Sequence, residues 1–105
     1  MYDKFRHIYK LLKALERAMD CDELDVEAVS AKGLGISENE WTALIEMLLD
    51  EGYIKGAKVY ENIMGTTVRD VDRMKITLRG MEYLKENHLM KKAAETAIGI
   101  VKIIG

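Results

Sequence analysis

Apolar residues recur every three or four positions at the start of the chain, the spacing that one buried face of an α-helix produces. This spacing predicts a helix over residues 3–19, with a buried stripe of Phe5, Ile8, Tyr9, Leu12, Leu15 and Met19. Away from that stripe, four basic residues fall in one sector of the helix. We call this set the basic ridge: Arg6, Lys10, Lys13 and Arg17.

Capping residues predict two further helices. Asp25 is expected to cap a short helix over residues 26–31. A glycine-containing turn follows this helix and ends it. Ser37 and Glu40 have the spacing of a capping box, in which each side chain bonds the backbone amide of the other. The helix that follows should run to about residue 51, with a buried face of Trp41, Leu44, Ile45, Leu48 and Leu49.

The second half of the chain reads as a hairpin between helices. Residues 53–60 and 74–77 predict strands, and residues 61–73 predict a loop in which 66–71 form part of a hairpin arm. Thr77 should cap a helix over 78–86, and residues 89–104 predict a last, apolar helix.

This order of elements is typical of a winged helix-turn-helix, in which the hairpin is the wing. We therefore expect an α+β, mostly α-helical fold, with a winged helix-turn-helix over residues 1–87 and an additional C-terminal helix over 88–105 in the same domain. An α+β domain of another topology is the alternative.

Charge is divided unevenly along the 105 residues, whose formal net charge is −2. Residues 20–51 hold ten acidic residues and one basic residue, a charge of −9, and the remaining fifteen basic and eight acidic residues give +7. The recognition helix of a winged helix-turn-helix would be residues 38–51, whose outer face has no Lys or Arg and would be repelled by DNA phosphates.

Basic residues gather in the predicted wing instead: Lys55, Lys58, Arg69, Arg73 and Lys75. These residues, together with the basic ridge, are the expected contacts to double-stranded DNA. The alternative is that both sets are ordinary solvated faces, with the wing residues paired to Glu61, Asp70 and Asp72.

Candidate catalytic chemistry is sparse. The only histidines, His7 and His88, lie near opposite ends of the chain, and no triad pattern is evident. The single cysteine, Cys21, lies in an acidic stretch without the ligand spacing of a metal site. We expect no enzyme, cofactor, metal or small-molecule substrate. The lone cysteine, and the lack of a signal peptide or an apolar run of about 18 residues, favour the cytoplasm over a membrane.

The predicted C-terminal helix has more apolar surface than one small domain covers. A homodimer would bury the surplus, with contacts at Leu89, Ala93, Ala97, Ile100, Val101 and Ile104. Binding to a membrane surface is the weaker alternative, because the lysines are few and no large aromatic residue marks the interface.

The segment ITLRGMEYLKEN at residues 76–87, followed by LMKKA at 89–93, resembles the closing segment of the YjcQ-type winged-helix proteins of Gram-positive bacteria and their phages. FRHIYKLL at 5–12, EGYI at 51–54 and VYE at 59–61 agree with this resemblance. It implies a winged helix in a phage or prophage setting. That family has no established biochemical activity, so no functional residues carry over.

Two functions follow as expectations. The first is a non-enzymatic, DNA-associated regulatory or accessory module that contacts DNA through the basic wing and the first helix. The second is a protein-interaction adaptor that uses the acidic helix 38–51 and the apolar C-terminal helix.

Overall fold

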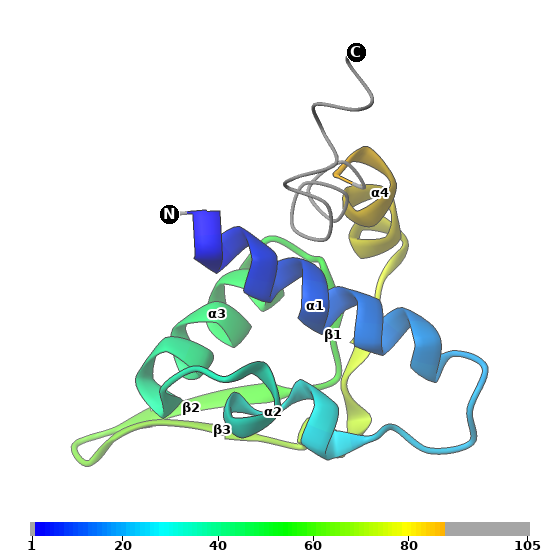
Figure 1. The fold of residues 1–105 in the computed structure, drawn as a ribbon. Helices are drawn as coiled ribbons and strands as arrows, with labels where there is room; N and C mark the ends of the chain where they lie inside the picture. Colours follow the sequence, from blue (N-terminus) through cyan, green and yellow to red (C-terminus); the bar gives the residue numbers. More distant parts are fainter. Residues whose placement is uncertain (1, 88–105) are drawn as a thin grey trace.

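The computed structural model describes residues 2–87, and Figure 1 shows a helical body with a long hairpin along one side. The elements, in chain order, are α1 (Tyr2–Ala18), the 3-10 helix η1 (Val26–Val29), α2 (Ala31–Leu34), α3 (Glu38–Asp50), β1 (Ile54–Lys55), β2 (Lys58–Asn62), β3 (Gly65–Arg69), η2 (Val71–Arg73), β4 (Lys75–Ile76) and α4 (Leu78–Glu86). This is the expected α+β, mostly helical fold in the order of a winged helix. The expected C-terminal helix, with its dimer contacts, lies outside the described residues.

Helix α1 packs on the core with a slightly different face from the predicted one. Tyr9, Leu12 and Leu15 are buried as expected, and Leu11 is buried beside them. Phe5 and Met19 were wrongly placed in the stripe, since they are 44% and 61% exposed. Helix α1 ends at Ala18, which leaves Met19 in the turn after it, and Phe5 borders an open groove.

The expected single helix over 26–31 is two short pieces that meet at Ser30. The Ser30 hydroxyl donates to the carbonyl of Glu27 at 2.7 Å, at the end of η1, and accepts from the amide of Gly33 at 3.0 Å, at the start of α2. One side chain therefore ends the first turn and caps the next. The capping role expected for Asp25 is wrong, because its side chain makes no capping hydrogen bond.

Helix α3 begins as predicted, but only half of the capping box forms. The Ser37 hydroxyl accepts from the amide of Glu40 at 3.1 Å. The Glu40 carboxylate is directed instead to α1, where it lies 3.2 Å from His7 Nδ1 and 3.6 Å from Lys4 Nζ. The side chain that would have closed the box therefore links two helices.

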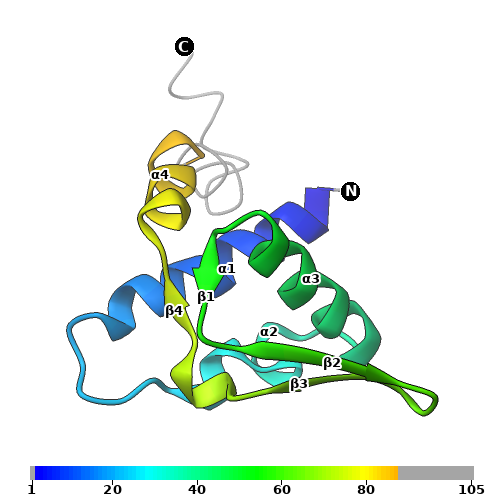
Figure 2. The same ribbon diagram turned by 180° about the vertical axis from the view of Figure 1, so that it is seen from behind.

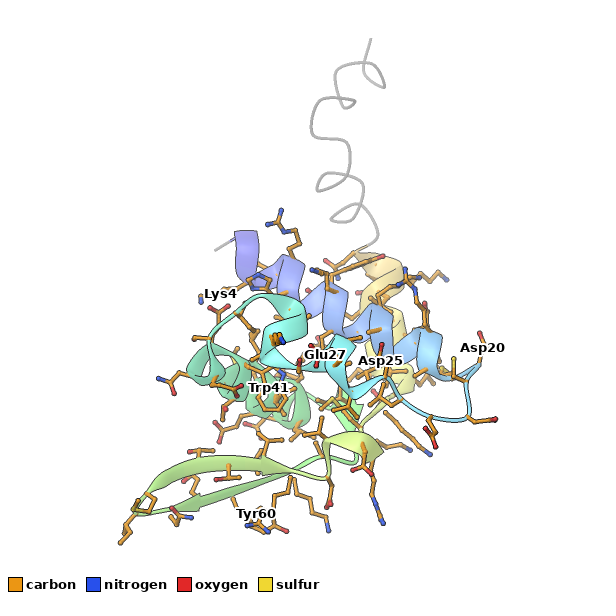
Figure 3. The ribbon with its side chains drawn as sticks, turned by 60° about the horizontal axis from the view of Figure 1, so that its bottom comes forward. Lys4, Asp20, Asp25, Glu27, Trp41 and Tyr60 are labelled. Atoms are coloured by element: carbon orange, nitrogen blue, oxygen red, sulfur yellow. The ribbon has the colours of Figure 1, made fainter. Side chains whose placement is uncertain are left out.

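Trp41 anchors α3 in the core, as predicted. It is 8% exposed, and its indole nitrogen donates to the carbonyl of Val29 at 2.7 Å. Figure 3 shows the ring directed inward, between α3 and the short helical turns. The bond satisfies the one polar atom of the ring, so burial of the aromatic surface carries no unpaired donor.

The predicted strand 53–60 is divided at Gly56 into β1 and β2. Gly56 has a φ of 98°, and a Cβ atom there would collide with the backbone carbonyl of Arg73. On one side of this kink, β1 pairs with β4, and Ile54 lies opposite Ile76 in the core. On the other side, β2 pairs with β3, which covers much of the hairpin arm predicted over residues 66–71.

We call the β2–β3 hairpin, residues 58–69, the wing. Figures 1 and 2 show that it extends beyond the body on the side away from α4. Its turn is held by the Asn62 side chain, whose Oδ1 accepts from the amide of Met64 at 2.7 Å. Within residues 2–87, no helix is both long enough and apolar enough to cross a membrane.

Candidate nucleic-acid interface

The wing has one face toward the body and one toward solvent. Val59 lies opposite Val68, both are half-buried, and Val68 packs against the core. Side chains alternate between faces along a strand, so the intervening residues point outward. We call this outward set the outer wing face: Lys58, Tyr60, Thr67 and Arg69, all exposed.

The outer wing face combines cations with an aromatic ring. Lys58 lies directly opposite Arg69 in the strand register, and Tyr60 lies opposite Thr67. The Arg69 guanidinium carbon is 5.7 Å from the centroid of the Tyr60 ring, a cation–π arrangement. In Figure 3 Tyr60 projects from the wing away from the body. Glu61, which the sequence offered as an ion-pair partner, belongs to the opposite face.

A directly opposed pair of like charges is electrostatically unfavourable. Such cross-strand pairs contribute several tenths of a kcal/mol against pairing, within the roughly 0.2–1 kcal/mol range of cross-strand interactions. Lys58 and Arg69 form one such pair, and Lys55 and Lys75 form a second in β1–β4. A bound anion would relieve the repulsion in either pair.

The five basic residues predicted for the wing belong to two cross-strand pairs and to the 3-10 turn η2. Lys55 and Lys75 line a groove of about 440 Å³ that also holds Asp22 and Asp72, beneath the C-terminal end of α1. These two lysines therefore have carboxylates nearby. Arg73 is exposed on η2, which lies between Arg69 and Lys75 along the chain.

The tip of the wing is apolar, which the sequence reading missed. Ile63 and Met64 are 102% and 90% exposed, and they occupy the turn between β2 and β3. Asn62 and Gly65 on either side are turn formers, and they are the signal that could have located this tip.

The basic ridge lies on a different side of the molecule from the wing. Figures 1 and 2 show α1 across one side of the body and the wing along the other. Within the ridge, Lys13 Nζ lies 2.7 Å from Glu16 Oε1. The ridge and the wing are therefore two separate basic surfaces.

Helix α3 meets the wing through an uncharged and acidic edge. Asn39, Thr42, Ala43 and Glu46 line a shallow groove of about 290 Å³ with Thr66 of β3. No residue of α3 is basic. The position that a recognition helix would occupy beside the wing thus offers carboxylates rather than cations to a phosphate backbone.

A second surface of interest is a groove bordered by α1, α3 and α4, which we call the apolar groove. Its volume is about 420 Å³, and its lining is Lys4, Phe5, Ile8, Leu44, Met47, Leu48, Glu51, Tyr53 and Tyr83. The rings of Tyr53 and Tyr83 have centroids 5.2 Å apart. Burial, and then the neighbouring Tyr53, raise the pKa of Tyr83 above its ordinary value.

Metal-ligating side chains are not clustered in the part of the chain that the structure describes. Among residues 2–87, no three His, Cys, Asp or Glu side chains are placed to hold a metal ion together. His7 faces Glu40 in the contact between α1 and α3, and Cys21 is exposed.

Within residues 2–87, the three larger helices and the β-hairpin wing follow each other in an order compatible with the winged-helix class. Comparison with protein families makes this assignment more specific: the chain matches the family described as YjcQ protein over residues 9–103. The chain belongs to the YjcQ family. It matches no curated protein and no solved structure.

Proposed function

We propose that this protein is a non-enzymatic, DNA-associated regulatory or accessory module that contacts double-stranded DNA through the outer wing face. The observation that carries the proposal is the register of the wing, which sets Lys58 opposite Arg69 on an exposed face without a carboxylate among its four residues. Phosphate oxygens would supply the missing counter-charge.

The other residues of the wing support the same partner. Tyr60 and the Arg69 guanidinium offer planar groups that can stack on sugars or bases. Ile63 and Met64 at the tip are of the type that minor-groove proteins insert between base steps. In this proposal the stem of the wing follows the phosphates and the tip enters the minor groove.

Helix α3 does not read the major groove in this proposal. Its acidic side chains beside the wing would face the phosphates, and that repulsion weakens any approach in the usual orientation. The protein would therefore dock with the wing leading and α3 turned away. Sequence discrimination would be low, since phosphate contacts position a protein without specifying a base sequence.

Binding of a labelled DNA duplex over about 50–200 mM salt tests the proposal. Two phosphate contacts, by Lys58 and Arg69, give a slope of log K against log salt of about −1.8. The double variant Lys58→Glu, Arg69→Glu should lose this slope and most of the affinity.

The matched control is Lys10→Glu in the basic ridge, which changes the same kind of charge on the other side of the body. It should leave the affinity nearly unchanged. Failure of the unaltered chain to bind at the lowest salt would refute the proposal, and an equal loss for Lys10→Glu would refute the assignment to the wing.

The second candidate function is a protein-interaction adaptor, and the apolar groove is the observation that favours it. Met47 and Glu51 of α3 line this groove, so the acidic helix and an apolar surface meet there. A pull-down in which Met47→Asp abolishes capture of a partner, while the wing variants retain it, would favour this function over DNA binding.

We further propose that the protein is a homodimer, associated through the C-terminal contacts Leu89, Ala93, Ala97, Ile100, Val101 and Ile104. A two-fold interface would let one apolar face cover its own copy, and would present two wings to one duplex. Sedimentation of the full chain should give a dimer, and of Ile100→Glu a monomer. A monomeric unaltered chain at high micromolar concentration would refute the dimer.

We propose a cytoplasmic setting, which the single exposed cysteine favours, in a bacterium that carries the gene on a phage or prophage, as the resemblance of the sequence implies. Expression of the chain in a bacterial host, followed by separation of the nucleoid, cytosol and membranes, would test the cytoplasmic setting.

A further inference from the structure

We infer that the apolar groove is the docking site of the C-terminal segment of the same chain, with Met90, Ala94 and Ile98 directed into it. The inference is independent of DNA binding, because it concerns the face of the body bordered by α1, α3 and α4. Five of the six proposed dimer contacts use another side of that segment, and the sixth, Val101, shares the face that we place in the groove.

The groove itself requires a cover. Phe5 and Met47 on its two walls are 44% and 50% exposed, and Ile8, Leu44 and Leu48 lie between them. Charged groups on its lining are confined to Lys4 and Glu51. A surface of this composition is typical of a site that receives an amphipathic helix, since each apolar Å² left in water costs about 25 cal/mol.

The described part of the chain ends beside this groove. Tyr83 lines the groove, and the last turn of α4 is bonded to it. The backbone amide and the side-chain amide of Asn87 each donate to the Tyr83 carbonyl at 2.9 Å. Residue 88 therefore starts about one helical turn from the groove wall. Helices joined by a short connection normally pack side by side and antiparallel.

The sequence after Asn87 has the pattern that such a groove binds. At 100° per residue, Met90, Ala94 and Ile98 share one face of a helix. Leu89, Ala93, Ala97, Ile100 and Ile104 share the neighbouring face. The groove admits side chains rather than a whole helix, so it takes the first face and leaves the second free for the proposed dimer.

The family match supports a cis arrangement. It runs from residue 9 to residue 103, so the C-terminal segment belongs to the same family unit as the α3 and α4 walls of the groove. A segment held next to its site by a short connection has a high effective concentration there, which a second copy or a separate partner lacks at low protein concentration.

Thiol labelling of the full chain tests this inference. The test uses a Cys21→Ser background with one new cysteine, at Phe5→Cys or Met47→Cys in the groove or at Met19→Cys away from it. Met19 is at least as exposed as the other two residues. The two groove cysteines should react with an alkylating reagent at least about tenfold more slowly than the cysteine at position 19. Equal rates at the three positions would overturn the inference.

Second-site variants identify the occupant. Ile98→Glu should restore fast labelling at Met47→Cys, whereas Lys92→Glu, on the side of the segment away from the groove, should leave the protection intact. Protection that survives Ile98→Glu would overturn the inference, because another group must then cover the groove.

Concentration separates the two possible sources of the segment. Protection that is constant across protein concentrations, including those at which the chain is monomeric, supports docking within one chain. Protection that disappears on dilution would overturn it in favour of a segment from a second copy. Neither result depends on whether the wing binds DNA.

Discussion

Helix α3 and the wing lie side by side and have opposite roles in the fold. Helix α3 buries Trp41, Leu44, Ile45 and Leu48, and its exposed residues are uncharged or acidic. The wing buries no residue fully, and its outer face is basic and aromatic. The helix that usually reads DNA is here packed into the core, while the hairpin presents the exposed cations and the aromatic ring.

The difference shows how one scaffold can separate stability from binding. Substitutions of the four buried residues of α3 should act mainly on folding, because their side chains fill the core. Substitutions on the outer wing face should act mainly on binding, because those side chains are exposed. The predictions below test this separation.

The largest effect is expected for Trp41→Ala. Loss of the ring and of its hydrogen bond to Val29 should lower the free energy of unfolding by about 3–5 kcal/mol, as for other buried aromatic residues. Tyr60→Ala on the wing is the matched control and should change it by less than about 0.5 kcal/mol. Chemical denaturation of both variants measures the difference, and similar losses would remove the contrast between the two regions.

A smaller decrease in the free energy of unfolding is expected for Gly56→Ala, at the kink where the wing leaves the body. The positive φ alone costs an alanine about 1–2 kcal/mol, and the added Cβ meets the carbonyl of Arg73. Thermal unfolding should therefore show a clear decrease in Tm. Gly65→Ala has a positive φ but open space around it, so it separates the conformational cost from the collision.

The smallest change in stability is expected for Lys58→Thr, and its sign is the informative part. Removal of one charge from the Lys58–Arg69 pair should stabilise the wing by about 0.2–1 kcal/mol. The same substitution should weaken DNA binding. A loss of both stability and binding would indicate that Lys58 has a structural role.

Most of the fold could be predicted from local patterns, because caps and apolar spacing are local. Ser37 and Thr77 begin their helices as expected, through bonds to the amides of Glu40 and Gly80. The break at Gly56 was missed because its cause is a carbonyl seventeen positions away, at Arg73. Ser30 was missed as a boundary because one hydroxyl serves two short elements.

The candidate site was predictable in composition but not in arrangement. The sequence identifies Lys58 and Arg69 as basic wing residues, yet only the strand register shows that they are opposed. Register depends on where the turn falls, and the turn at Ile63 and Met64 was read as part of a longer loop. Lys55 and Lys75, close in sequence to the other basic residues, face a different groove.

The measurement that tests the central claim most directly is DNA affinity after opposite charge reversals in the two regions. Lys58→Glu with Arg69→Glu should weaken binding of a duplex uniformly across sequences and flatten its salt dependence. Glu46→Lys with Asp50→Lys should strengthen binding, because it removes acidic charge from α3, whose Glu46 lies beside the wing. Weaker binding by the folded α3 variant, together with unchanged binding by the wing variant, would show that α3 reads DNA and would contradict the account.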